Sequence, residues 1–485
     1  MNNKVFRFFA SVKAAVVVIF GLAVALATAT FMESAYDTPT AQYYIYKSVP
    51  FLILLTFFGI NIICSALSRW PWKKRHTPFL VAHLGIIMLL TGSWMTQQFG
   101  LDGNMRISEG EISSTVELDN ASLMVMASDG AKRVPIKWLP PTVPFKKIAL
   151  KDRGLPYDLV VDQYMTHADP VYNFLPDTNA VLATAKPAVQ VNLKGGPMQI
   201  SQDFWLWGGD PGWASIQAGP ALLQLDVPGM ARADKPTAGH PTLQIVPGPD
   251  GVKYVATSSE GKRVEGHLNS KEFSDTQVIT PGWKNVSITF KKYFPRALPQ
   301  TTYKEARMQY GPAAPPSAIH LVSGAGGEGA ELWLGLGERA VLEVPGANGV
   351  KQEVELGYFP ERVTLPYAVR LDHFKIDHYD GTRDPSSYSS QVTVIDDGPA
   401  AVRLENNNQV VISMNEPLHY RGTALYQASY EDADPRPITS IFSVNRDPGR
   451  IWKYLGSLLI VFGSILLFVS RYWGKKAASP KGASV

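Results

Sequence analysis

The chain lacks most of the chemistry that enzymes and disulfide-stabilised domains need. Its 485 residues include a single cysteine, Cys64, so no disulfide can form within the chain and no thiol pair is available for redox chemistry. The motifs GxSxG, HExxH and CxxCH are absent as well. Their absence excludes the common hydrolase, metalloprotease and covalent c-type heme patterns.

Apolar residues gather in four long runs near the two ends of the chain. The runs cover about 11–31, 48–68, 78–96 and 451–470. As helices, they are long enough to cross the roughly 30 Å hydrocarbon core of a bilayer. No such run occurs between 100 and 448. The sequence therefore predicts an integral membrane protein with three spans before a large segment and one span after it.

Acidic residues are missing from three short segments that flank these runs. The segments contain eleven basic residues and no Asp or Glu; the basic residues are Lys4, Arg7, Lys13, Arg69, Lys73, Lys74, Arg75, Arg471, Lys475, Lys476 and Lys481. The segment between the first two runs contains Glu33, Asp37 and a single basic residue, Lys47. By the positive-inside rule, both termini are predicted to be cytoplasmic.

An alternative for the first run is a cleaved signal peptide. Ala25, Ala27 and Ala29 offer small-residue cleavage patterns after a basic start. We expect the first run to be retained as a span, and this alternative stays open.

The segment 100–448 consists of short alternating runs without long helical periodicity. Turn residues separate the runs, which include STVELDNASLMVMAS, PAVQVNLKG, NVSITFKKYF, YAVRLDHFKI and SQVTVIDDG. We therefore predict a membrane protein with four transmembrane α-helices plus a large mainly-β extracytoplasmic domain, sandwich or barrel-like. The predicted domains are a three-helix membrane region at 1–99, the mainly-β domain at 100–448, the fourth helix at 449–473 and a cytoplasmic tail at 474–485. The pattern sets no boundaries within about 130–355.

The outer segment has too little positive charge for a nucleic-acid-binding protein. Eleven of the 46 Lys and Arg residues lie in the cytoplasmic segments, so the other 35 are outnumbered by the 42 acidic residues. Binding to phosphate backbones depends on an excess of Lys and Arg. We therefore expect no nucleic-acid partner.

One histidine, His83, lies inside a predicted span. It occurs about six residues into the third run, which places it in the cytoplasmic half of the membrane. An ionisable residue inside a span is a candidate for function, and a neutral imidazole is a normal axial ligand of heme iron. The alternative is that His83 merely hydrogen-bonds a neighbouring helix. The other candidate ligands in the four spans are Met32, Met88, Met95 and Cys64, so a partner could supply a second one.

Small residues recur in the last two runs. Gly85 and Gly92 lie in the third run, and Gly456 and Gly463 lie in the fourth. Glycines in spans let helix backbones approach closely. We expect these four to serve helix packing.

Two further patterns have ordinary structural explanations. Gly324–Gly329 matches GxGxxG, but a strand-like AELWLGL follows where a phosphate-binding helix would be needed, so we expect a glycine-rich hairpin loop. His373 and His378 lie near acidic residues in LDHFKIDHYDG. Residues five apart on a strand point to opposite faces, so we do not expect a metal there.

Several separate segments resemble the ResB family, the partner of the ResC or CcsA protein in system II cytochrome c maturation. They are ASVKAAVVVIFGLAVALAT, PFLVAHLGIIMLLTG, GLDGNMRISEGE, VISMNEPLHYRGTALYQASY and DPGRIWKYLGSLLIVFGSILLF. Their order, and the arrangement of three spans, a large outer domain and a fourth span, are similar to the family pattern. The stretch 130–355 carries no motif of the family.

The resemblance implies a role in moving heme from the cytoplasm to the outer face and presenting it for attachment to apocytochrome c. His83 matches the family's third-span histidine, which implies that it is an axial ligand of heme b and binds no metal other than heme iron. The implied partners are a ResC/CcsA-like membrane protein, apocytochrome c and the lipid bilayer. The implied location is the bacterial cytoplasmic (inner) membrane, with the large domain in the periplasm.

By this interpretation the chain is not an enzyme by itself, and no catalytic residue is predicted. It would be a non-catalytic subunit of a heme-ligation, or holocytochrome c synthase, complex. Two alternatives remain open: a purely structural membrane scaffold that binds no heme, and a b-type heme electron carrier, which would need two axial ligands.

Overall fold

The computed structural model describes most of the chain. The described residues are 4–127, 130–177, 185–195, 200–230, 239–274, 277–283, 285–306, 316–323, 330–345, 351–382, 384–399, 401–404, 406–432 and 437–477. They divide into two compact units: Met1–His167 with Ala306–Val485, and Ala168–Glu305. Each unit is described by itself below.

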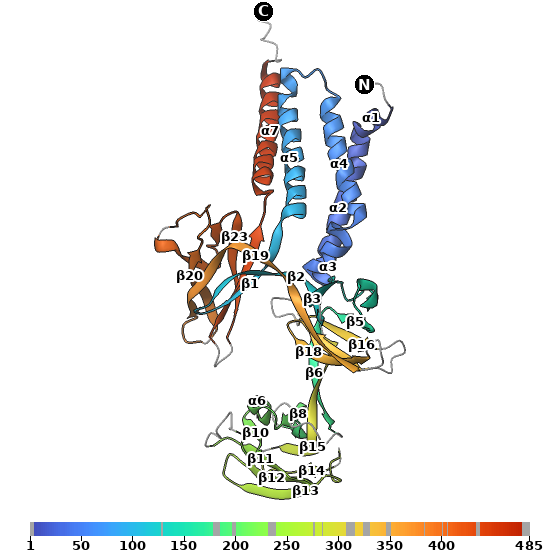
Figure 1. Cartoon of the computed structure of the whole chain (residues 1–485). Coiled ribbons are helices and arrows are strands. Elements are labelled where there is room, and N and C mark those ends of the chain that lie inside the picture. Colours follow the sequence, from blue (N-terminus) through green and yellow to red (C-terminus); the bar gives the residue numbers. More distant parts are fainter. Residues whose placement is uncertain are drawn as a thin grey trace, which may run out of the picture. The chain divides into compact units, whose positions relative to one another are not determined.

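Four helices of the first unit are long and apolar enough to cross a membrane (Figure 1). They are α2 (Val12–Ala35), α4 (Val49–Leu67), α5 (Thr77–Phe99) and α7 (Arg450–Ala477). Short helical segments accompany them: α1 (Lys4–Phe9), α3 (Thr38–Ala41), η1 (Gln42–Tyr46) and η2 (Lys74–His76). Ser11 and Ser48 cap α2 and α4, since each side chain accepts a hydrogen bond from a backbone N–H of the first turn. The four predicted spans are confirmed.

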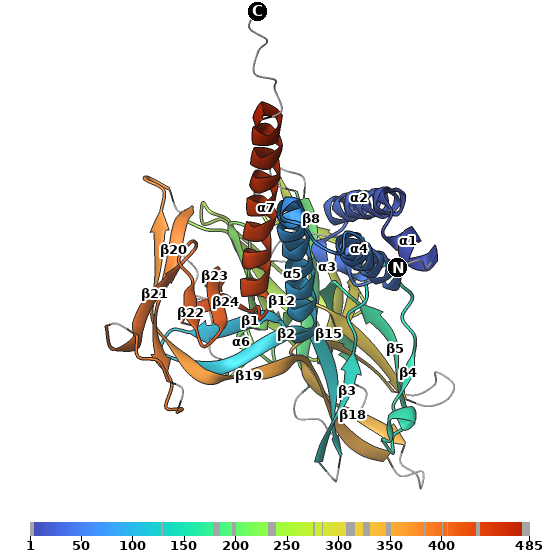
Figure 2. The ribbon, with the colours of Figure 1, turned by 90° about the horizontal axis from the view of Figure 1, so that it is seen from above.

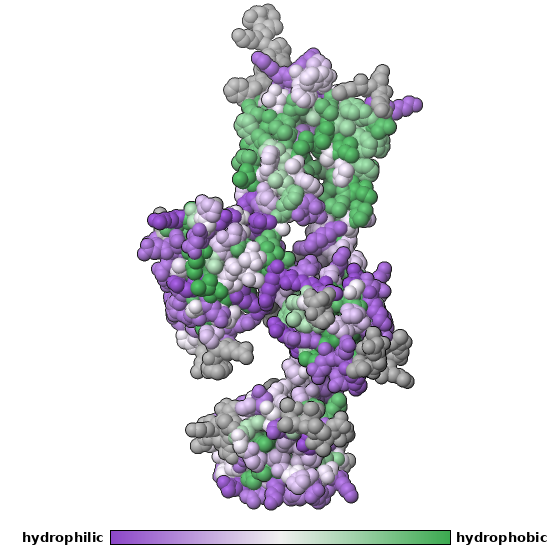
Figure 3. All heavy atoms as spheres, in the orientation of Figure 1, coloured by the Kyte–Doolittle hydropathy of each residue, from purple (hydrophilic) through white to green (hydrophobic). Residues whose placement is uncertain are grey.

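Helices α2, α4 and α7 expose many large apolar side chains, and apolar residues dominate the face of the helices seen in Figure 3. Phe20 of α2 is 70% exposed and Phe468 of α7 is 72% exposed. Such surfaces are unfavourable in water and favourable in hydrocarbon. The exposure identifies these helices as lipid-facing.

Helices α5 and α7 lie against one another through glycine (Figures 1 and 2). A Cβ added to Gly456 would lie 2.7 Å from the Gly85 carbonyl oxygen, and one on Gly85 would lie 2.6 Å from the Gly456 carbonyl oxygen. Towards the two ends of this contact, Gly92 lies against Gly449 and Gly463 against Ala82. The backbones are in direct contact, which confirms the packing role predicted for these glycines.

The same two helices continue directly into a pair of strands. β1 (Leu101–Ser108) follows α5, and β24 (Thr439–Arg446) precedes α7. β1 and β24 pair antiparallel from Leu101↔Arg446 to Ser108↔Thr439. Asp447 ties the junction together: its Oδ1 accepts from Thr96 Oγ1 at 2.5 Å and from the Gly449 N–H at 3.0 Å, and its Oδ2 accepts from Lys453 Nζ at 2.6 Å.

The first unit contains a ten-stranded sheet in the order β21-β20-β19-β2-β1-β24-β23-β22, with β18 beside β19 and β3 beside β2. In β1, buried Met105 and Ile107 alternate with exposed Asn104 and Arg106, the period of a strand with one face in a core. The remaining strands are β2 (Ile112–Ala127), β3 (Gly130–Ile136), β18 (Arg339–Pro345), β19 (Lys351–His378), β20 (Pro385–Ile395), β21 (Gln409–Ser413), β22 (Leu418–Tyr420) and β23 (Thr423–Glu431), with η4 (Asn406–Asn408) before β21.

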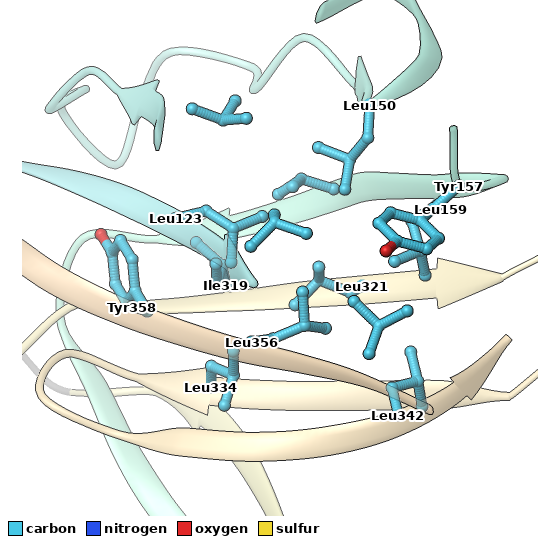
Figure 4. Close-up of a cluster of buried hydrophobic side chains, with 14 of the residues drawn as sticks. Leu123, Leu150, Tyr157, Leu159, Ile319, Leu321, Leu334, Leu342, Leu356 and Tyr358 are labelled. Carbon is cyan, nitrogen blue, oxygen red and sulfur yellow. The ribbon is translucent and has the colours of Figure 1, made fainter. Parts of the chain in front are cut away.

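Strands β2 and β19 are long enough to serve two separate cores. One half of the pair packs with β20–β24 around Val369, Val392 and Phe442. The other half packs against a four-stranded sheet, β17-β16-β5-β4, around Leu123, Leu321 and Leu356 (Figure 4). That sheet comprises β4 (Ile148–Ala149), β5 (Leu159–Met165), β16 (Ala318–Ser323) and β17 (Glu331–Gly335), with η3 (Lys151–Arg153) before β5. Register shifts at Pro360/Arg362 and Thr364/Val369 interrupt the pairing between the two halves.

The second unit is a separate β-structure with its own core. Two five-stranded sheets, β13-β12-β11-β10-β9 and β14-β15-β7-β8 with β6 beside β15, pack around Leu223, Ile245 and Phe290. Its elements are β6 (Ala168–Pro176), β7 (Lys186–Gly195), β8 (Ile200–Trp207), α6 (Pro211–Ala214), β9 (Ser215–Ala218), β10 (Ala221–Leu225), β11 (Thr242–Pro247), β12 (Gly251–Thr257), β13 (Arg263–Asn269), β14 (Val278–Ile279) and β15 (Val286–Glu305).

The predicted fold class is confirmed: four apolar helices accompany a large mainly-β region between the third and fourth. The structure adds a division that the sequence left undefined, because unit Ala168–Glu305 lies within the stretch 130–355. The predicted glycine-rich loop at 324–329 lies outside the described residues.

We predict that Gly456→Ala destabilises the protein. The added methyl group would meet backbone atoms of α5 that cannot move aside, and such overpacking typically costs about 1–3 kcal/mol. Thermal unfolding of the purified full chain in detergent should show a lower midpoint. Gly59→Ala is the matched control, because its methyl group would lie 3.8 Å from the Leu90 side chain, in ordinary contact. An unchanged midpoint for Gly456→Ala would contradict the close helix contact.

We also predict that Asp447 contributes to the stability of the folded protein and that this contribution depends on pH. Burial raises the pKa of this carboxyl, but the hydrogen bonds from Lys453 and Thr96 outweigh burial and hold its pKa below the usual value. A lowered pKa in the folded state stabilises the fold above the unfolded-state pKa, and this stabilisation is lost as the pH falls through the folded-state value. Asp447→Asn should therefore lower the unfolding midpoint at neutral pH, with a loss of about 1–3 kcal/mol in the free energy of unfolding. In acid, the midpoints of the variant and of wild type should become equal.

Asp102→Asn is the control of opposite sign. Burial and nearby Asp119 raise the pKa of Asp102, so its charge opposes folding at neutral pH. This variant should leave the midpoint at pH 7 unchanged or raise it. Equal losses in both variants at every pH would show that the Asp447 charge contributes nothing.

Candidate functional site

His83 lies on α5, six residues beyond the first residue of the helix, and its side chain is half-buried. At 1.5 Å per residue this is about 9 Å along the axis from the η2 end. The glycine contact with α7 uses Ala82, Gly85 and Gly92 of the same helix. His83 follows Ala82 by one residue, about 100° round the helix, so it is not on the stripe that packs against α7.

The His83 ring is held by its own helix. Nδ1 lies 3.0 Å from the carbonyl oxygen of Phe79, one turn earlier. A carbonyl oxygen can only accept, so Nδ1 must be the nitrogen that carries the hydrogen. In the neutral imidazole the lone pair is then on Nε2. A backbone carbonyl bonded to one ring nitrogen, with the other nitrogen available, is the usual arrangement of a metal-binding histidine.

Phe79 and Arg69 form a stack with this ring. The Phe79 and His83 ring centroids are 3.7 Å apart with an interplanar angle of 36°. On Phe79, the guanidinium carbon of Arg69 lies 3.3 Å from the phenyl centroid. Arg69 follows the C-terminal end of α4, so the stack joins α4 to the first turns of α5. We refer to Arg69, Phe79 and His83 as the inner stack.

Sequence reasoning found His83 but not the rest of the inner stack. In the sequence, Arg69 belongs to a basic segment that orients the spans, and Phe79 is one of many apolar residues in the third run. The spacing of four residues between Phe79 and His83 was the available signal, since such residues neighbour one another on a helix. Nothing in the local sequence indicates that Arg69 lies over Phe79, because that contact depends on the path of the chain from α4 to α5.

Neither methionine of α5 shares the face that carries His83. Met88 and Met95 follow His83 by five and twelve residues, which places them about 140° and 120° round the helix. Cys64 is half-buried on α4, and Met32 is near the C-terminal end of α2. Helix α5 itself therefore offers no second ligand on the His83 face.

In LDHFKIDHYDG the two histidines are exposed on β19, whereas Leu371 and Phe374 are buried. His373 Nδ1 is 2.7 Å from Glu109 Oε1, so the ring pairs with a carboxylate across the sheet. His378 is exposed at the end of the strand. Among the described residues, no group of three His, Cys, Asp or Glu side chains is arranged to hold a metal.

The segment VISMNEPLHYRGTALYQASY forms a hydrogen-bonded corner rather than an open site. Asp396 accepts from the Gly398 N–H, the Tyr420 hydroxyl and Arg421 Nη1, at 2.9, 2.9 and 3.0 Å. The Gly398 N–H first, and then the other two donors, lower the pKa of Asp396 below its usual value. The Asp396 carboxylate is only 3% exposed, so the charge is shared inside the fold rather than presented to a ligand.

Deeper in the same core, Ser390, Gln427 and Ser440 bond one another. Ser390 Oγ donates to Gln427 Oε1 at 2.6 Å, and Gln427 Nε2 donates to Ser440 Oγ at 2.9 Å. All three side chains are buried. Buried polar groups of this kind determine which strands pair in a core, provided that each is satisfied.

The comparisons with known proteins match part of this same region. The model of the ResB-like family matches residues 321–441, from the end of β16 to β24. Protein NrfI of Wolinella succinogenes is 37% identical over 111 residues, which is 23% of this chain and 11% of that protein. The chain thus covers about a tenth of the length of this relative.

The family match includes β19, the strand shared by both cores of the first unit, and all of β20–β23. It includes the Asp396 corner and the Gln427 side chain, and it does not include His83. The resemblance found in the sequence is confirmed over this segment: residues 321–441 of this membrane protein match the model of the ResB-like family.

Proposed function

We propose that this protein is a membrane subunit of a system II cytochrome c maturation complex. It helps to move heme b from the cytoplasm to the outer face of the membrane and to present it for attachment to apocytochrome c. The observation that carries the proposal is the ResB-like segment at 321–441 on a chain whose α5 contains His83 with Nε2 available as a ligand.

The family match supports the general part of the proposal, a role in cytochrome c biogenesis. The inner stack supports the heme-binding part. Heme iron takes an imidazole nitrogen as an axial ligand, and a porphyrin is compatible with an apolar helix surface. The hydrogen bond to the Phe79 carbonyl sets both the tautomer and the direction of the His83 ring before any ligand arrives.

A second axial ligand would come from a partner subunit. Helix α5 has no methionine on the His83 face, and a ResC/CcsA-like membrane protein is the expected partner in this family. We propose that the mainly-β region contacts this partner, apocytochrome c or both. Attachment chemistry would belong to the partner, so this chain would act as a non-catalytic subunit.

The proposed location is the bacterial cytoplasmic (inner) membrane, with both termini cytoplasmic and the β-region in the periplasm. Charge supports this orientation. Arg69, Lys73, Lys74 and Arg75 gather at the end of α5 that lies near His83, and Lys4 and Arg7 lie in α1. In this orientation the inner stack is in the cytoplasmic half of the membrane, where heme from the cytoplasm would arrive.

A second candidate function is a scaffold that organises an assembly without binding heme. One observation favours it: the family match lies within the β-region, over residues 321–441, and leaves out His83. In this case the hydrogen bond of His83 to its own helix would be its whole role. The two functions differ in one measurable property, which is heme content.

We predict that His83→Ala loses heme. The full chain, purified together with its ResC/CcsA-like partner, should contain less heme per protein by about tenfold or more, because the variant has no imidazole at this place. The measurement is the reduced absorption spectrum at equal protein concentration. Added imidazole should restore part of the heme, since it can occupy the space left by the side chain and supply the same nitrogen.

His76→Ala is the control for a general effect of removing a histidine at this end of α5. His76 lies in η2, and its Nδ1 accepts from the Lys73 N–H. This variant should retain the heme content of wild type. Unchanged heme in His83→Ala would refute axial ligation and favour the scaffold function.

A further inference from the structure

The unexplained charge nearest to His83 belongs to Arg69. The segments that flank the spans on this side contain no Asp or Glu. Among the ion pairs of the described residues, none includes Arg69. Its neighbour is the Phe79 ring, 3.3 Å below the guanidinium carbon. Stacking of this kind leaves the N–H edges of a guanidinium free to donate in its own plane.

We infer that Arg69 binds a propionate carboxylate of the heme whose iron His83 ligates. The inference rests on the proposed function and deepens it, since it names the group that recognises the acidic edge of the porphyrin. Arg69 is then a positioning residue that fixes which way the heme lies in the membrane.

The direction of the inner stack carries the inference. A porphyrin plane lies perpendicular to the bond between its iron and an axial imidazole, so it extends sideways from His83. Phe79 lies against one face of the imidazole, 3.7 Å away, and is one turn nearer to the η2 end. Arg69 lies on the Phe79 ring. Arg69 is therefore the cation two ring contacts away from His83, on the side of the η2 end, where the carboxylate edge of a porphyrin held at Nε2 would meet it.

The chemistry of the two groups is complementary. Heme carries two propionate carboxylates on one edge, and a guanidinium binds a carboxylate through two parallel N–H bonds. Arg69 is exposed at the end of an apolar helix, so its charge lies where hydrocarbon gives way to water. Heme would thus be held with its iron among apolar side chains and its acidic edge towards water.

Two other roles for Arg69 lead to different outcomes. Its contact with Phe79 could serve only to hold α4 against α5, or its charge could bind a lipid phosphate. Neither role depends on the propionates of heme. A comparison of hemin with hemin dimethyl ester, which lacks the propionate charges, therefore distinguishes propionate binding from these two roles.

The experiment is a titration of the full-length protein in nanodiscs, together with its partner, with hemin and with the dimethyl ester. Absorbance gives the affinity for each, and a redox titration gives the midpoint potential. For Arg69→Gln we expect hemin affinity to fall about tenfold or more while ester affinity is unchanged, because a bond between charged groups is lost. The midpoint potential of bound heme should become more negative, because a nearby positive charge is removed.

Arg69→Lys keeps the charge and should retain part of the hemin affinity. Arg75→Gln is the matched control, because Arg75 lies in η2 of the same basic segment. It should bind both ligands as wild type does. Equal losses of hemin and ester in Arg69→Gln would show a role in helix packing, and unchanged binding of both would leave only a lipid contact; either result overturns the inference.

His83→Ala separates this inference from the proposed function. If His83→Ala loses both ligands while Arg69→Gln binds hemin as wild type does, the axial role stands and the propionate role is wrong. If His83→Ala keeps both ligands, the proposed function fails, and the inference fails with it.

Discussion

The contact between α5 and α7 is the constraint on which the rest of the first unit depends. Gly85 and Gly456 bring two helix backbones together that are more than 350 residues apart in the chain. The same pair continues as β1 and β24, so one antiparallel ladder runs from the helices into the ten-stranded sheet. Lipid offers no hydrophobic drive for helix association, which makes close van der Waals packing and the Asp447 hydrogen bonds the available sources of stability.

This arrangement places the contact with α7 on a different side of α5 from His83. Because α7 occupies the Ala82–Gly92 stripe, His83 is turned away from the most closely packed contact. Its ring is positioned by Phe79 of its own helix, and Arg69 from the end of α4 covers that phenyl ring. A partner helix could therefore approach His83 without displacing α7. This agrees with the proposal that the second ligand of heme comes from another protein.

The ResB-like segment has a different role within the chain. Its polar residues, among them Asp396, Tyr420 and Gln427, satisfy one another inside the β-region. These hydrogen bonds lie within the part of the β-region that matches the ResB-like family model. Heme handling at α5 and partner contact at the β-region would then be linked through β1 and β24.

Composition and periodicity determined the four spans, the mainly-β character of the segment between them and the candidate residue His83. These features are local, since a run of apolar residues, or an alternation of apolar and polar residues, is visible in a few consecutive positions. The sequence also showed which glycines would pack, but not the pairing of Gly85 with Gly456. Only the tertiary structure decided that pairing, the separate unit at Ala168–Glu305 and the position of Arg69 on Phe79. These features join residues that are distant in the chain, and no local pattern records such contacts.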